Sequence, residues 1–441
     1  MGGRCGYPPS MRVLILGGNG FIGTEICRVL PAGGHAVTAL ARNPGSAKRR
    51  LSSVAWLRRD LRTMRTAADW HFLSEFDAVV NCAGALQDGA RDDVTAVQKV
   101  AMLALYEAAA SFGLRPIVQI SARTDGPGSD RSFLASKRHA DEALQRSGVP
   151  FVIIRPAIVI GRNAHGGSAL LRALAATPWR TPLVYGQTPM QFTALADLAA
   201  AVRAALVGEI AAGSDLALAA PERLTLHEAV ALHRDWLGLQ PVPAMAVPTT
   251  FARTATGIAD LLGHLGWRSP LRSTAMAVAE GGVTEADAMG QAPAGRPPVA
   301  SLAETLLANP AGVQDLWFAK LYLLKPVVIG ALSLFWLASG VVALARFDQS
   351  SAILADALGS RPIANALTTV TSLADILLGA GVLVRSYASA SLIGMVLVSL
   401  GYLAAATVVA PHLWADPLGP LVKVLPAIVL ALIALATLDE R

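Results

Sequence analysis

Four long apolar runs fill the C-terminal part of the 441-residue chain, and they limit its fold more than any other feature. The runs cover residues 326–345, 365–384, 386–411 and 418–438. Each approaches the roughly 20 residues that an α-helix needs to cross a bilayer, and only the second and the fourth contain a charge. The sequence therefore predicts a transmembrane domain of four helices over residues 313–441, with the lipid bilayer as its partner.

Composition agrees with a chain that is partly embedded in lipid. Hydrophobic residues make up 53% of the chain and charged residues 15%, which is too apolar for a purely soluble protein. The net charge is +6, but the lysines and arginines are scattered and do not form a stripe with interleaved aromatic residues. We therefore do not expect nucleic acid as a partner.

The three cysteines and the N-terminal residues suggest an intracellular soluble part. Cys5, Cys27 and Cys82 have no metal-like spacing, so we expect reduced cysteines and no metal site. Residues 1–10 lack the apolar segment of a secretory signal peptide and are expected to form a flexible extension.

Short apolar runs alternate with helical periodicity before the membrane domain. The runs cover residues 12–16, 36–41, 54–58, 77–83, 116–121 and 151–160. Such runs are typical of a parallel sheet that is covered on both faces, so residues 11–160 are predicted to form a doubly wound α/β core. Residues 161–290, with expected helices at 197–207 and 226–237, are predicted to form a substrate-side or lid region. Three prolines within residues 291–299 mark a linker, predicted over 291–312.

A glycine-rich segment, GGNGFIG, follows the first predicted strand directly and precedes a predicted helix. In this context Gly17, Gly20 and Gly23 allow a tight turn, a close approach of backbone N–H groups to a pyrophosphate, and close packing of the helix. Asn19, Phe21 and Ile22 lie in the same segment and are expected to border the cofactor. The fold class predicted is thus a doubly wound parallel Rossmann sheet, α/β, with a C-terminal four-helix transmembrane bundle.

The end of the second predicted strand indicates which dinucleotide binds. An NAD-specific site places Asp or Glu there to bind the ribose hydroxyls, whereas this chain has Arg42. A cation at that point favours the 2′-phosphate of NADP(H) through charge-assisted hydrogen bonds. NADP(H) is therefore preferred, and NAD(H) is the alternative if Arg42 is only a solvated surface charge.

Together with the glycine spacing, NCAG at residues 81–84, Ser121 and RPAIVIG at residues 155–161 make the chain from residue 11 to residue 288 resemble an extended or atypical short-chain dehydrogenase/reductase. Within that superfamily it is most similar to the group of the nucleotide-binding accessory subunit of respiratory complex I. The resemblance implies the following positions near the cofactor: Asp60 and Leu61 at the adenine, Cys82, Ala83 and Gly84 along its length, and Pro156 and Ile158 near the nicotinamide. Asp60 is equally well explained as a turn-forming carboxylate at a strand end.

The membrane part is similar to the DoxX-like family. The similarity covers residues 316–441 and includes WADPLGPLVKVLPA at residues 414–427. It implies a membrane module that is often linked with redox or quinone-associated systems, without defining a reaction.

The catalytic motif of the dehydrogenase superfamily is incomplete in this chain. Carbonyl reduction there uses a serine and a YxxxK pair on one helix face, in which tyrosine is the acid or base and lysine lowers its pKa and holds the ribose. Ser121 and Lys137 are in place, but the tyrosine position is Phe133, which cannot transfer a proton. An active enzyme would need a substitute acid, for which Ser132, Ser136, Tyr185 and water were all candidates, or an acceptor that takes hydride without a protein proton donor.

Two charges lie within the apolar runs. Ionisable groups in hydrocarbon cost several kcal/mol unless they are paired or face a wet cavity, so Asp375 and Lys423 are predicted either to pair or to mark a ligand site. Lys423 is equally expected to extend to the membrane interface. A nucleotide-gated transporter would rest on these two residues alone.

These features favour a membrane-anchored oxidoreductase that acts on a lipid-soluble or membrane-delivered acceptor, such as a quinone or an apolar carbonyl compound. The alternative is a non-catalytic NADP(H)-binding module, structural or redox-sensing, within a membrane assembly of several proteins. Lys320, Lys325 and Arg385 against Arg346 and Arg361, together with the cofactor, favour a multi-pass protein of the inner (cytoplasmic) membrane whose Rossmann domain is in the cytoplasm.

Overall fold

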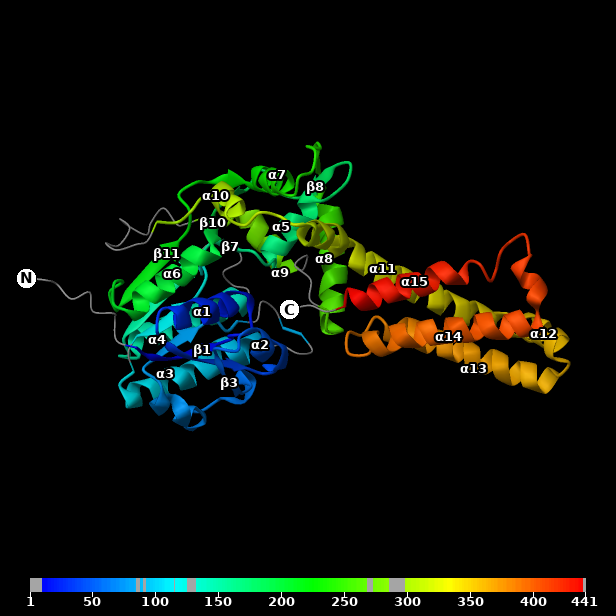
Figure 1. Cartoon of the computed structure of the whole chain (residues 1–441), viewed down its shortest axis with the longest axis horizontal. Helices are drawn as coiled ribbons and strands as arrows, with labels where there is room; N and C mark the ends of the chain where they lie inside the picture. The colour runs from blue at the N-terminus through cyan, green and yellow to red at the C-terminus, as the bar shows by residue number, and fades with distance from the viewer. Residues whose placement is uncertain are drawn as a thin grey trace, which may run out of the picture. The chain divides into compact units, whose positions relative to one another are not determined.

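The computed structural model of the chain describes residues 10–84, 88–89, 93–114, 116–124, 132–267, 273–284 and 298–438 (Figure 1). The chain divides into two compact units. Unit 1 contains Met1–Asp260 and Ser269–Ala319, and unit 2 contains Leu261–Arg268 and Lys320–Arg441. Residues 1–9 of the predicted N-terminal extension, including Cys5, and residues 291–297 of the predicted linker lie outside the described residues.

Unit 1 is built on a seven-stranded sheet in which all neighbouring strands are parallel, in the order β11-β6-β5-β4-β1-β2-β3. The strands are β1 (Arg12–Leu16), β2 (Ala36–Ala41), β3 (Ala55–Arg58), β4 (Ala78–Asn81), β5 (Ile117–Ile120), β6 (Phe151–Pro156) and β11 (Ser214–Leu218). This arrangement confirms the predicted doubly wound sheet.

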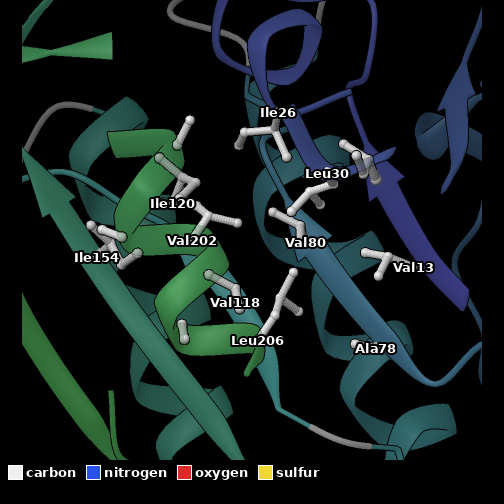
Figure 2. Packing of buried hydrophobic residues seen from close by; sticks show 14 of the residues in the cluster. Val13, Ile26, Leu30, Ala78, Val80, Val118, Ile120, Ile154, Val202 and Leu206 are labelled. Carbon is white, nitrogen blue, oxygen red and sulfur yellow. The ribbon is translucent and has the colours of Figure 1, made fainter. Parts of the chain in front are cut away.

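Helices cover both faces of the sheet, which explains why its central strands are mostly apolar on both faces. Alternate residues of β1, β4, β5 and β6 pack against α1 (Phe21–Ala32) and α6 (Leu195–Leu206) on one face, with Ile26 and Leu30 meeting Val202 and Leu206 (Figure 2). The opposite residues of the strands pack against η2 (Ala67–Glu75), α3 (Ala101–Phe112) and α4 (Ser132–Arg146), around the fully buried Trp70.

The last predicted strand, residues 151–160, is two strands in the structure. It leaves the main sheet after β6, where the backbone N–H of Ala157 donates to the Thr193 hydroxyl at 3.0 Å, and β7 (Ile158–Ile160) then pairs with β10 (Phe192–Ala194). The edge strand β11 was not among the six predicted runs. Residues 161–290 thus supply both a strand and a covering helix of the main sheet, in addition to the smaller elements.

The smaller elements of unit 1 form a second layer of short strands and helices around their own apolar core. They are α5 (Gly167–Ala175), β8 (Thr181–Leu183), β9 (Pro189–Met190), β12 (Leu224–Thr225), α7 (Leu226–Trp236), β13 (Ala244–Ala246), α9 (Ser273–Gly281) and α10 (Leu302–Leu307). Helix α7 confirms the predicted helix at 226–237. Helix α8 (Thr249–His264) contributes residues to both units.

His233 on α7 couples the stability of this layer to pH. The imidazole is fully buried, its Nδ1 lies 2.8 Å from the Ala229 carbonyl oxygen, and burial with help from the Arg172 charge lowers its pKa from 6.5 to about 4. The unfolded chain therefore takes up a proton before the folded chain does, and folding stability falls as the pH drops from 6.5 towards 4, by about 3 kcal/mol over the whole interval.

We expect the thermal midpoint of the full-length protein in nanodiscs to decrease from pH 7 to pH 5. This decrease should be smaller in the His233→Leu variant. The exposed His71 provides the control, since His71→Leu should retain the wild-type dependence. An unchanged pH dependence in His233→Leu would show that this buried imidazole is not the source.

Unit 2 is a bundle of apolar helices. The helices α11 (Val313–Ala345), α13 (Arg361–Gly381) and α14 (Ala388–Val409) are each long and apolar enough to cross a membrane, whereas α15 (Val424–Ala436) is shorter, with 13 residues. These four correspond to the four predicted runs. A further helix, α12 (Phe347–Leu358), lies between the first two and was not predicted.

Close packing in the bundle depends on glycines. A Cβ atom on Gly340 would lie 2.4 Å from the Ser372 carbonyl oxygen, and one on Gly379 would lie 2.8 Å from the Leu337 nitrogen. Glycine at these two positions lets α11 and α13 approach closely, as small residues do in membrane bundles. At one end of the bundle, the Trp267 indole N–H donates to the Leu383 carbonyl oxygen at 2.6 Å, and the Arg385 backbone N–H donates to the Leu265 carbonyl oxygen.

Candidate dinucleotide site

The residues predicted to bind a cofactor come together at one edge of the main sheet. Gly17, Arg42, Asp60, Cys82, Ser121 and Pro156 lie at or just beyond the carboxyl ends of β1, β2, β3, β4, β5 and β6. Because these strands are parallel neighbours, their carboxyl ends lie along a single edge. The strands after β1 are added on one side of it (β2 and β3), and the later strands are added on its other side, beginning with β4. Ligands of open α/β sheets bind where the strand order reverses in this way, which here is between β1 and β4.

The loop after β1 has a shape that only glycine permits. Gly17 has a φ of +71°, and a Cβ atom on it would lie 2.9 Å from the Cα atom of Ala83. A Cβ atom on Gly23 would lie 2.3 Å from the Gly17 carbonyl oxygen, so α1 could not pack this close to the loop. Gly20 is the N-terminal cap of α1, and both Asn19 and Gly20 are exposed. The exposed start of a helix is thus held against the end of β1, where it can receive a phosphate.

The side chains that follow this loop are partly buried. Phe21 and Ile22, in the first turn of α1, are both half-buried. The Phe21 ring stacks on the His165 imidazole, with ring centroids 5.9 Å apart and planes at 20°. A residue from the loop before α5 therefore lies over the first turn of α1, which sequence reasoning did not predict.

Positive charge gathers where β2 and β3 end. The Arg62 guanidinium contacts the Asp60 carboxylate at 2.6 Å, and its hydrogen bonds hold the pKa of Asp60 below its usual range, with the Arg42 charge acting in the same direction. The Arg59 backbone N–H donates to the Ala41 carbonyl oxygen, which places Arg59 next to Arg42. Three arginines and one aspartate leave this corner cationic. Leu61 is buried beside it.

Hydrogen bonds of the Asn81 side chain fix the loop after β4. Its amide nitrogen donates to Gln119 Oε1 at 2.8 Å, and its Oδ1 accepts a hydrogen bond from the Ala83 backbone N–H at 2.9 Å. Cys82 and Ala83 are half-buried and Gly84 is exposed, so this loop presents backbone along the sheet edge. Burial raises the pKa of Cys82, and it raises the pKa of Cys27 to about 12, which agrees with two reduced, unreactive thiols.

Ser121 belongs to a buried charge network that the sequence did not reveal. Its hydroxyl donates to Asp141 Oδ2 at 2.5 Å, and the Arg155 guanidinium contacts the same oxygen at 2.8 Å. Arg155 also binds both oxygens of Asp215, at 2.8 and 2.9 Å. Burial raises the pKa of Asp141, and the charge of Arg155 and the Ser121 hydroxyl counteract part of that rise. The Ser121 proton is therefore already committed to a carboxylate.

Lys137 lies one turn before Asp141 on the same face of α4. Its ammonium group donates to the Ile120 carbonyl oxygen at 3.0 Å, and the residue is 8% exposed. Burial lowers the pKa of Lys137, while the charge of Asp141 opposes that change. The Phe133 ring, at the position of the superfamily's tyrosine, has its centroid 5.8 Å from the ammonium nitrogen. The aromatic ring is thus present without a hydroxyl group.

None of the substitute acids named from the sequence has a described contact with Ser121. The Ser136 hydroxyl donates to Gln98 Oε1 at 3.1 Å, and Tyr185 interacts with Glu280. The side chain of Ser132 lies outside the described residues. Pro156 and Ile158, expected near the nicotinamide, are half-buried where the chain leaves the sheet.

Two family profiles match the chain. The profile of the NAD dependent epimerase/dehydratase family matches residues 13–215, and that of the DoxX-like family matches residues 333–432. The chain joins an epimerase-type short-chain dehydrogenase domain to a DoxX-like domain.

The curated relatives match only the epimerase-type domain. It is 29% identical over 185 residues to the epimerase family protein SDR39U1 of Bos taurus, which covers 36% of this chain and 57% of that protein. An uncharacterized chloroplastic protein of Arabidopsis thaliana is 27% identical over 165 residues, covering 36% of this chain and 54% of that protein. The match thus spans little more than half the length of these relatives.

Solved structures share the fold of the epimerase-type domain. The epimerase Mth375 of Methanothermobacter thermautotrophicus has a TM-score of 0.52 at 16% identity, covering 72% of this chain and 94% of that one. MoeE5 in complex with UDP-glucose and NAD has a TM-score of 0.50 at 17% identity, covering 71% of this chain and 99% of that one.

Proposed function

We propose that the chain is a membrane-anchored protein that binds NADP(H) in its epimerase-type domain as a structural or sensing ligand. The observation that carries this proposal is a loop shaped for a dinucleotide beside a catalytic motif that lacks its proton donor. Glycines shape the loop after β1, while Phe133 replaces the tyrosine and the Ser121 proton is bound to Asp141. NAD bound in MoeE5, which shares the fold, supports a nicotinamide dinucleotide as the ligand.

The residues at the sheet edge fit such a cofactor. The backbone N–H groups in the first turn of α1 would bind the pyrophosphate, and the loop from Cys82 to Gly84 would lie along the cofactor. Arg42, with Arg59 and Arg62 beside it, would bind a 2′-phosphate. Lys137, whose ammonium group lies at the end of β5, would contact the nicotinamide ribose. When bound, the nicotinamide would be able to supply or accept a hydride.

Replacement of Arg42 tests the preference for NADP(H). Charge-assisted hydrogen bonds contribute about 1.5–3 kcal/mol, so Arg42→Ala should weaken NADPH binding roughly 10- to 100-fold and leave NADH binding nearly unchanged. Calorimetric titration of both nucleotides into the full-length protein in nanodiscs measures the two affinities. Arg58→Ala, an exposed arginine at the end of β3, is the matched control. Equal losses for the two nucleotides would remove the case for NADP(H).

A second candidate function is an oxidoreductase that transfers hydride to a lipid-soluble acceptor. The buried Lys137, still in the superfamily's position, is the observation that favours it. The same nanodisc samples, offered quinones and apolar ketones, should consume no NADPH if the first proposal holds. NADPH oxidation that disappears in Lys137→Ala would instead establish the reductase.

We also propose that unit 2 lies in the inner (cytoplasmic) membrane with the epimerase-type domain in the cytoplasm, and that other membrane proteins assemble with it. Three helices long enough to span a bilayer and the DoxX-like match support the membrane placement. Lys325 and Arg385 both lie near the ring of Trp267, at the end of the bundle where α11 leaves unit 1, which supports a cytoplasmic side there.

A further inference from the structure

A polar centre lies inside the apolar bundle of unit 2. The carboxyl group of Asp375 on α13 accepts a hydrogen bond from the Ser339 hydroxyl on α11 at 2.8 Å and one from the Tyr402 hydroxyl on α14 at 2.9 Å. Asp375 is 6% exposed, and the described residues contain no ion pair between it and Lys423. The predicted pairing of these two charges is therefore absent, and hydroxyl groups from two other helices take its place.

The centre lies well within the length of α13. Asp375 is six residues from the C-terminal end of α13, about 9 Å along the helix, and fourteen residues, about 21 Å, from the N-terminal end. The hydrocarbon core of a bilayer is about 30 Å thick, so these distances place the carboxyl group within it. Polar groups at such a depth are costly and mark functional sites.

The centre opens to the lipid side through Ser339. This residue is exposed and lines a shallow groove of about 540 Å³ on α11, whose other lining residues are apolar: Ala331, Leu334, Phe335, Ala338 and Val342. The Ser339 proton is donated to Asp375, so its oxygen presents lone pairs to the groove. The groove therefore presents one hydrogen-bond acceptor, the Ser339 oxygen, in an otherwise apolar wall.

We propose that this groove binds a lipid-soluble alcohol or phenol, whose hydroxyl group donates to Ser339 beside Asp375 and whose apolar body lies along α11. A donor fits because the Ser339 hydroxyl has already donated its proton to Asp375 and can only accept. A plain acyl chain would leave the Ser339 oxygen without a donor. The inference does not depend on the dinucleotide site, because unit 2 alone supplies every residue in it.

Photocrosslinking with two matched probes tests the proposal. The first is 4-hydroxy-4′-octylbenzophenone, a lipid-soluble phenol, and the second is its methyl ether, which cannot donate. Under near-ultraviolet light the excited ketone of either probe takes a hydrogen atom from a nearby C–H bond, and the two radicals join in a new C–C bond. The full-length protein in nanodiscs, without nucleotide, is labelled at pH 6.5 and mapped by peptide mass spectrometry.

We expect the phenol to label residues 331–342 about five times more than the ether does, which is the ratio given by one net hydrogen bond. Ser339→Ala should abolish the difference. Ser333→Ala should keep it, because the Ser333 hydroxyl donates to the Gly379 carbonyl oxygen and does not line the groove. Ala338→Phe, which fills the groove from an exposed position, should reduce the labelling by both probes.

Equal labelling by the two probes in the wild type would overturn the proposal. So would labelling that is spread uniformly over the lipid-exposed side chains of α11, α13 and α14. Either result would show that the groove holds acyl chains only. A preference for the phenol that persists in Ser339→Ala would also overturn it, because the hydroxyl group would then be bound elsewhere.

Discussion

Replacing Arg155 with methionine should lower the free energy of unfolding of unit 1 by about 3–5 kcal/mol. The guanidinium is 12% exposed and holds two carboxylates, of which Asp141 is 1% exposed. Without Arg155, Asp141 keeps the Ser121 hydroxyl as its hydrogen-bond donor and the charge of Lys137 nearby, but it loses its contacting ion-pair partner while remaining buried. Urea unfolding of the full-length protein in nanodiscs, followed by tryptophan fluorescence, measures the change.

Two further variants show whether the buried charge of Asp141 causes the loss of stability in Arg155→Met. Arg155→Met combined with Asp141→Leu should recover most of the loss, because the remaining Asp215 is partly exposed and can be solvated. Arg12→Met breaks the exposed ion pair with Asp77 and should change little. If the double variant is no more stable than Arg155→Met alone, the loss comes from packing and not from charge.

Gly23→Ala should weaken dinucleotide binding by about 100-fold or more. The new Cβ atom would lie 2.3 Å from the Gly17 carbonyl oxygen, which is backbone and cannot rotate away, so α1 and the loop after β1 must separate. A displacement of about 1 Å between groups that bind one ligand is enough for a 100-fold effect. Calorimetric titration with NADPH measures the loss, and the circular dichroism spectrum reports whether the sheet has survived.

Gly45→Ala is the matched control for this substitution, since an added Cβ atom there meets nothing within 4 Å at the start of α2 (Gly45–Arg50). It should bind NADPH as the wild type does. Retention of full affinity by Gly23→Ala would place the dinucleotide somewhere other than the loop after β1.

Local sequence patterns were sufficient to predict the main sheet and the glycine loop. Six strands, the helices α6 and α7 and the Gly17 turn are encoded by contiguous residues whose period or backbone freedom is visible in the sequence. Strand β11 was missed because SDLAL begins with two polar residues and lacks β-branched residues, and it becomes a strand by pairing with β6. The division of residues 151–160 was missed for the same reason, since the partner β10 comes 32 residues after the end of β7.

Local sequence patterns could not predict the charge network around Asp141 or the hydrogen-bond partners of Asp375. Asp141 follows Lys137 by one helical turn, and this spacing was a visible signal. Its partners Arg155 and Asp215 lie on two strands far apart in the sequence, so only the sheet order brings them together. Asp375 was recognised as unusual, but its partners Ser339 and Tyr402 are ordinary residues on two other helices.

The contacts of Trp267 have a consequence for how the protein is made. Residues 261–268 belong to unit 2, but the ribosome releases them before the rest of unit 1 and before the bundle helices. Their partners Leu383 and Arg385 emerge more than a hundred residues later. At ordinary rates of translation this is a delay on the order of ten seconds, during which Trp267 lacks its partners. All residues of unit 1 are synthesised before Lys320, so unit 1 can fold first, whereas residues 261–268 wait for their partners in unit 2 until the residues after α13 have emerged.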